Sequence, residues 1–225
     1  MHGPSTLTEN SANLGLTMRI EIYAATRTQQ GRPQNEDAFL IGRDAVPYVV
    51  LCDGAGNAER AAKRAIKQFE VLLKDVGFNE ARAAETWSKW IRLLDSGFAG
   101  GAQTTFLAAV FFGSEYFGAC AGDSRSYLFT RNGDLRILTD TASNSRLGSG
   151  EAQAFPFHGA LASGDILLFL TDGAWTPLGL PLLKKAILGS VGKHFSELPP
   201  AILDAAGRAG RADDMTALAV RAVSF

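Results

Sequence analysis

The sequence lacks the features that several common protein classes require. It contains only two cysteines, Cys52 and Cys120, each in an apolar run without a CxxC partner, which argues against a disulfide framework and a zinc knuckle. No run approaches the roughly 18 apolar residues of a membrane span, and the amino terminus lacks the basic start and apolar core of a signal peptide. We therefore predict a cytoplasmic protein whose two thiols are buried and reduced.

The chain also lacks a strong charge of either sign. Its formal net charge is -1 and no stretch is strongly basic, which argues against nucleic acid or an anionic membrane as a partner. Repeats, low-complexity tracts and linkers rich in Pro, Gly or Ser are absent from the sequence, and no heptad or amphipathic tail indicates assembly. We predict a flexible leader at 1–17, a single domain at 18–225 and a monomer.

Hydrophobic periodicity predicts separate groups of strands and helices. Apolar and polar residues alternate at 19–26, whereas apolar residues recur at helical spacing in 58–73 and 79–95. A loop-rich stretch is expected at 139–164, and a helical region extends to about residue 208. The segregation of strands from helices favours an α+β fold over alternating βαβ units. The predicted strands lie at 19–26, 46–52, 104–112, 115–121, 126–130, 135–138, 165–171 and 215–223.

Carboxylates stand at one end of four of these apolar strands. If the strand ends meet at one edge of packed sheets, the carboxylates converge, and a positive charge must lie among them because they would otherwise resist ionising together. Oxygen ligands without histidine or cysteine are typical of Mg2+ or Mn2+ sites rather than of zinc or copper sites. A single Asp-Gly pair after a strand is typical of a turn, but four strand ends together favour a metal site. The residues are Asp53, Asp123, Asp172, Asp213 and Asp214.

Six motifs follow one another along the chain: "RPQNEDAF", "VVLCDGAGN", "GAQTTFLAAV", "GACAGDSRSYLF", "LLFLTDGAW" and "RADDMTALAV". In this order they resemble the metal-dependent serine/threonine protein phosphatases of the PP2C (PPM) family, over nearly the whole chain from about residue 19. The resemblance implies an α-β-β-α fold, in which a sandwich of two antiparallel β-sheets is flanked by α-helices. It also implies a pair of metal ions in a cleft at one end of the sandwich.

The resemblance further implies the ligands of two Mn2+ or Mg2+ ions. Asp53 is similar to the aspartate that bridges both ions, and Gly54 to the glycine whose backbone carbonyl is a ligand. Asp123 is similar to the ligand of a weaker third ion in many bacterial-type members. Glu36 resembles a carboxylate that reaches the ions largely through water. The remaining matches to metal-site residues are Asp37, Asp172 and Asp213.

Arg32 resembles the arginine that binds the phosphate group in this family. A guanidinium suits a phosphate dianion because it offers parallel donors that lysine lacks. Its alternative role is a salt bridge to Asp37. The implied reaction is direct hydrolysis of phosphoserine or phosphothreonine in a phosphoprotein, by a water that two ions about 3.5 to 4 Å apart acidify and orient. A bacterial enzyme of this kind would oppose a serine/threonine kinase.

The chain departs from the family at several positions. Asn57 stands where a glycine is common, Thr176 where an acidic residue is common, and Ala55 where many eukaryotic members have a histidine. The nearer match is therefore a bacterial-type member with a shortened flap at 138–150. These departures keep open a second hypothesis, a catalytically weak binding or regulatory module on the same fold. A third takes Ser124 as a serine-hydrolase nucleophile, but this class requires a downstream Asp/His pair and no Asp lies within several residues before His194.

Overall fold

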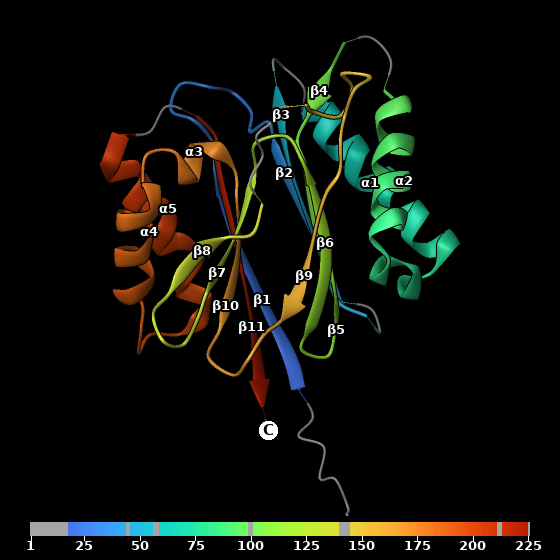
Figure 1. The fold of residues 1–225 in the computed structure, drawn as a ribbon. Coiled ribbons are helices and arrows are strands. Elements are labelled where there is room, and N and C mark those ends of the chain that lie inside the picture. The colour runs from blue at the N-terminus through green and yellow to red at the C-terminus, as the bar shows by residue number, and fades with distance from the viewer. Residues whose placement is uncertain are drawn as a thin grey trace, which may run out of the picture.

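The computed structural model describes residues 18–43, 46–55, 59–98, 101–139, 145–210 and 213–224. Two antiparallel β-sheets pack against each other, and helices cover the outer face of each, which gives the four layers seen in Figure 1. The predicted leader at 1–17 and Asn57 lie outside the described residues. No described helix is long and apolar enough to cross a membrane.

The first sheet joins the two ends of the described chain. Strand β1 (Met18–Arg27) pairs along its whole length with β11 (Met215–Ser224), so the first and last strands are neighbours. The sheet continues through β10 (Ile166–Leu170) and β7 (Arg125–Phe129) to β8 (Leu135–Ile137). Two of its interior strands, β10 and β11, are the ones that the sequence predicts to carry aspartates at their ends.

The second sheet supplies the other strands of the sandwich. Its order is β2 (Asp37–Gly42), β3 (Tyr48–Ala55), β5 (Phe106–Phe112), β6 (Glu115–Ala121) and β9 (Phe155–Ala160). The short strand β4 (Gln103–Thr104) pairs with the end of β3. The register of β2 and β3 places Asp37 directly opposite Asp53. Two of the predicted site residues are therefore cross-strand neighbours.

Helices pack on the two outer faces, as Figure 1 shows. The second sheet is covered by α1 (Glu59–Val76) and α2 (Ala84–Ser96), which the 3-10 helix η1 (Phe78–Arg82) connects. The helix predicted at 79–95 is thus divided between η1 and α2. The first sheet is covered by α3 (Asp172–Trp175), α4 (Gly179–Leu188), η2 (Phe195–Glu197) and α5 (Leu198–Gly210).

Aromatic packing fixes α1 and α2 on the second sheet. Phe69 is fully buried and its ring lies 5.8 Å from the ring of Trp87 and 5.6 Å from that of Trp90. Both tryptophans point into the core because they share the apolar face of α2. Cys52 and Cys120 are buried, free thiols, which confirms that prediction.

One strand lies where the sequence predicts loop. Strand β9 falls within 139–164 and pairs with β6 at the edge of the second sheet, so the loop prediction is wrong there. Pro156 is tolerated because an edge strand has a side that needs no ladder hydrogen bond. Phe157 is the one buried position of the strand, so the alternation that marks other strands is weak.

Replacing Phe69 with alanine is expected to lower the free energy of unfolding by about 3 to 5 kcal/mol, because a cavity would form among buried rings. Chemical denaturation followed by circular dichroism measures the change. Val71→Ala on the same helix is the control, since Val71 is 55% exposed and its replacement should cost less than about 0.5 kcal/mol. Equal losses in the two variants would contradict the assignment of this helix face to the core.

Candidate metal centre

Three of the predicted aspartates meet at one place between the sheets. Asp53 lies near the end of β3, Asp123 in the turn between β6 and β7, and Asp172 at the start of α3, one residue after Thr171. One carboxylate oxygen from each lies within 4.8 Å of the other two. Among the described residues, this is the group of side chains arranged to hold a metal ion. The predicted convergence of strand-end carboxylates is therefore confirmed for these three.

The three carboxylates are electrostatically costly without a cation. Burial, together with the neighbouring charges of Asp37 and Asp172, raises the pKa of Asp53 to about 9. Burial also raises the pKa of Asp172, with Asp123 and Asp213 acting in the same direction. Oxygen donors that resist ionising alone are suited to a hard divalent cation, which offsets their repulsion. The donor set fits Mn2+ or Mg2+.

Asp37 presents a free oxygen toward the interior. Its Oδ2 accepts hydrogen bonds from the hydroxyls of Thr171 at 3.0 Å and Thr216 at 2.7 Å. Its Oδ1 is buried and has no hydrogen-bond partner. Burial raises the pKa of this carboxyl to about 7. A buried carboxylate with one satisfied and one open oxygen is well placed to bind a cation or its water.

Arg32 and Glu36 lie together on the loop between β1 and β2. Arg32 Nη1 donates to Glu36 Oε2 at 2.9 Å and lies 3.8 Å from Asp213 Oδ1. The alternative salt bridge between Arg32 and Asp37 is wrong, because Glu36 is the partner and Asp37 bonds to threonine hydroxyls instead. The Arg32 side chain is 43% exposed, so its guanidinium faces solvent at the edge of the acidic group.

Asp214 has a structural role that the sequence did not separate from that of Asp213. It is buried, and its two oxygens accept the backbone N–H groups of Gln29 at 2.5 Å and Glu36 at 2.7 Å. It therefore fixes the loop that carries Arg32 and Glu36. Asp213 is half-buried, and its Oδ1 accepts the N–H of Asp214 at 2.8 Å. Backbone N–H groups occupy both oxygens of Asp214, whereas Asp213 accepts the N–H of its own neighbour in the chain, and sequence alone does not show this difference.

Two consecutive threonines, Thr104 and Thr105, hydrogen-bond the backbone of Asp53. The Thr105 hydroxyl accepts the N–H of Asp53 at 2.8 Å, and the Thr104 hydroxyl donates to the Asp53 carbonyl at 2.9 Å. Gly54 follows in β3, with its N–H bonded to the Glu36 carbonyl at 3.2 Å. These contacts hold the strand end rigidly, as a site of defined geometry requires.

The serine-hydrolase hypothesis fails on the geometry of Ser124. This residue is fully buried, and its hydroxyl shares a hydrogen bond of 2.8 Å with Thr105 rather than with a histidine. A nucleophile must reach its substrate and a general base.

Thr176, at the C-cap of α3, is exposed.

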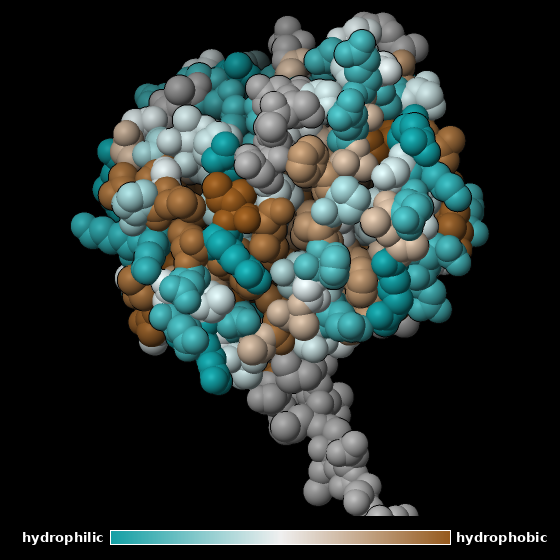
Figure 2. All heavy atoms as spheres, in the orientation of Figure 1, coloured by the Kyte–Doolittle hydropathy of each residue, from teal (hydrophilic) through white to brown (hydrophobic). Residues whose placement is uncertain are grey.

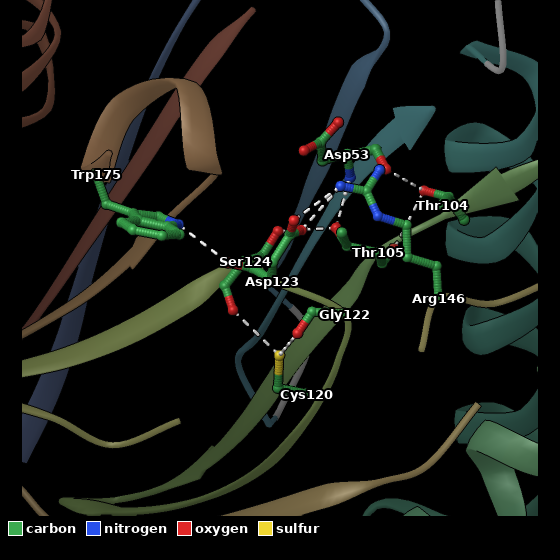
Figure 3. Close-up of polar contacts among 9 residues, drawn as sticks. All are labelled: Asp53, Thr104, Thr105, Cys120, Gly122, Asp123, Ser124, Arg146 and Trp175. Carbon is green, nitrogen blue, oxygen red and sulfur yellow. Dashed lines mark hydrogen bonds and ion pairs between the residues drawn. The ribbon is translucent and has the colours of Figure 1, made fainter. Parts of the chain in front are cut away.

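Arg146 is the site residue that the sequence analysis missed. Its Nη2 lies 3.0 Å from Asp123 Oδ1 and 2.9 Å from Asp123 Oδ2, and Figure 3 shows the guanidinium pointing at this carboxylate. It also lowers the pKa of Asp53 and Asp172 by its charge. The expectation of a positive charge among the aspartates was the available signal, but nothing in the sequence indicated which cation supplied it.

Comparisons with known proteins bear on the fold. No protein-family model and no curated protein matches this sequence. The catalytic domain of the serine/threonine protein phosphatase PstP, in complex with two manganese ions, is 21% identical at a TM-score of 0.75, over 92% of this chain and 100% of that chain. The chain has the fold of that phosphatase. This confirms the predicted sandwich of two antiparallel sheets flanked by helices.

Two further solved structures agree. The serine/threonine phosphatase Stp1 from Staphylococcus aureus is 19% identical at a TM-score of 0.76, over 98% of this chain and 99% of that chain. The S. agalactiae serine/threonine phosphatase is 22% identical at a TM-score of 0.74, over 90% of this chain and 99% of that chain. The likeness spans nearly the full length of all three solved chains.

In the metal-free protein, stability is expected to fall as the pH rises from about 5 to about 9. Asp37 and Asp53 have raised pKa values in the folded state, so above about pH 4 the folded chain binds more protons than the unfolded chain. The stabilisation is complete below the unfolded pKa and is lost through the folded pKa. Denaturation in EDTA at several pH values measures the slope. Asp53→Asn should flatten it, whereas a rise in stability over this range would contradict the electrostatic account.

Proposed function

We propose that this chain is a bacterial-type, metal-dependent phosphoprotein phosphatase of the PP2C family, acting on phosphoserine and phosphothreonine. One observation carries the proposal: Asp53, Asp123 and Asp172, from three separate parts of the chain, bring carboxylate oxygens within 4.8 Å of one another. The fold shared with serine/threonine phosphatases and the six motifs in order support it.

The residues at this place are suited to two Mn2+ or Mg2+ ions. Asp53, the Gly54 carbonyl, Asp172 and Asp213 would hold the ions directly, and Glu36 and Asp37 would hold them through water. The PstP structure, which holds two manganese ions, supports this number. When bound, the ions would supply the positive charge that activates a water for direct attack on phosphorus. No nucleophilic side chain is then required.

Arg32 would bind and orient the phosphate group. Its guanidinium lies at the rim, half-exposed, and is held near the ligands by Glu36. An arriving phosphate dianion offers stronger charge-assisted hydrogen bonds than a single carboxylate oxygen. If Arg32 exchanged its partner Glu36 for the phosphate group, the substrate would lie beside the ions and Glu36 would be free to hold their water.

The substrate would be a phosphoprotein whose phosphate a serine/threonine kinase supplies. We further propose that the enzyme is a cytoplasmic monomer formed by one domain at 18–225. A second candidate function, a weakly catalytic binding module on the same fold, is favoured by one observation. Arg146 already pairs with both oxygens of Asp123, which lowers the number of carboxylates open to ions.

Purified protein should hydrolyse p-nitrophenyl phosphate and a phosphothreonine peptide in Mn2+ or Mg2+ but not in EDTA. Asp53→Asn and Asp172→Asn should each reduce kcat by at least about 100-fold, because each removes charge that holds the ions. Asp75→Asn is the matched control, since Asp75 is exposed at the far end of α1. Binding of Mn2+ without turnover of either substrate would favour the binding module.

Arg32→Lys is expected to lower kcat/KM for the phosphopeptide by about 10- to 100-fold, because lysine cannot present two parallel donors to the phosphate. Mn2+ affinity should stay unchanged, since Arg32 is not a ligand. Steady-state kinetics together with calorimetry separates the two quantities. Arg92→Lys, at an exposed position of α2, controls for the substitution itself. An unchanged kcat/KM in Arg32→Lys would remove Arg32 from phosphate binding.

A further inference from the structure

Arg146 and Asp123 form an ion pair in which both side chains are largely shielded from solvent. The side chains are only 18% and 20% exposed. A single nitrogen, Nη2, contacts both carboxylate oxygens. Any ion that uses Asp123 must share these oxygens with a fixed positive charge or displace it.

The backbone that carries Arg146 is tied down on its C-terminal side. Leu147 is fully buried and forms a two-way bridge with Thr104, in which N–H and carbonyl groups pair at 2.9 and 3.1 Å. Thr104 in turn holds the carbonyl of Asp53. Arg146 is therefore anchored to the same strand pair that positions the proposed bridging ligand.

A buried carboxylate on α2 clamps the next residues of this strap, which we define as residues 146–152. Asp95 accepts the backbone N–H groups of Gly148 at 2.6 Å, Gly150 at 3.2 Å and Ala152 at 3.1 Å. Gly148 has a φ of +91°, and a Cβ there would lie 2.3 Å from the Ala102 carbonyl oxygen. These contacts hold the strap in place, and a movement of the loop that took Arg146 out of the site would break them.

Asp123 is equally fixed from the opposite side. The indole Nε1 of Trp175 donates to the Asp123 carbonyl at 3.0 Å, and the Arg125 guanidinium stacks 3.5 Å from the centre of the Trp175 ring. Figure 3 shows Trp175 and Arg146 on opposite sides of Asp123. Both members of the ion pair are held in place by their surroundings rather than by each other alone.

We propose that Arg146 is a built-in cation that competes with divalent ions for Asp123 and so weakens the binding of any ion that this carboxylate holds. The proposal deepens the proposed function, and rests on it, because it concerns which ions that site retains. Competition is reciprocal: an ion at Asp123 weakens the ion pair by the same factor by which the ion pair weakens the ion. Arg146 therefore stabilises the ion-free protein at the expense of an ion at Asp123.

Calorimetric titration of the metal-stripped full chain with MnCl2, with no substrate present, tests this directly. Arg146→Gln should bind its weakest Mn2+ at least about fivefold more tightly than the wild type, or bind one ion more. Arg146→Lys should resemble the wild type, because one nitrogen makes both contacts and an ammonium can replace it. Asp123→Asn and the double variant should both lack the additional binding.

Thermal unfolding supplies a second readout, in which Arg146→Gln should lower the stability of the ion-free protein and increase the stabilisation by Mn2+. In EDTA, Arg146→Gln should unfold at a lower temperature than the wild type, since its carboxylates lose their cation. In Mn2+ the same variant should gain more in melting temperature than the wild type, because the tighter ion stabilises only the folded state. A variant that folds only in Mn2+ would support the proposal for the same reason.

The two proposals fail in different ways. If Arg146→Gln binds the same number of ions with the same affinities, or loses affinity and stability together, Arg146 is only a structural support and this inference is overturned. A variant that stays unfolded with and without Mn2+ leads to the same conclusion. A wild-type protein that binds no Mn2+ at all would overturn the metal-dependent function, and the role of Arg146 with it.

Discussion

The repulsion among buried carboxylates is the constraint on which this structure depends. Asp37, Asp53 and Asp172 all have raised pKa values because burial and mutual charge oppose their ionisation. A fold that gathers such groups must also supply donors and cations to offset them. Threonine hydroxyls do so for Asp37, and the Arg146 guanidinium does so for Asp123. What remains uncompensated is the part of the site suited to metal ions.

Two kinds of aspartate can be distinguished around the site. Asp95 and Asp214 are buried, and both oxygens of each accept backbone N–H groups, so they act as clamps for loops. Asp53 and Asp172 belong to the group whose oxygens converge on one point. Backbone N–H groups satisfy the oxygens of both clamps. They hold the loops that carry Arg32 and Arg146, so the chemistry of the site depends on carboxylates that are not themselves proposed ligands.

Arg32 and Arg146 differ in how far they are exposed and how they are held, and this difference matches their proposed roles. Arg32 is half-exposed and held by Glu36 within its own loop, so a phosphate can exchange for its partner. Arg146 is shielded and lies at the start of a strap that Thr104 and Asp95 anchor. An exposed cation is suited to a substrate that binds and leaves, whereas a cation held in place by its surroundings is suited to setting how many ions a site retains.

The sequence by itself determined the order of strands and helices, the apolar faces and the aspartates at strand ends, because hydrophobic periodicity and turn chemistry are local properties. It missed β9, an edge strand with a proline and one buried position. Only the tertiary structure decided that Asp214 clamps a loop while Asp213 stays half-buried, and that Arg146 reaches Asp123 from 23 positions away. Such contacts join distant segments, and packing rather than local propensity determines which side chains meet.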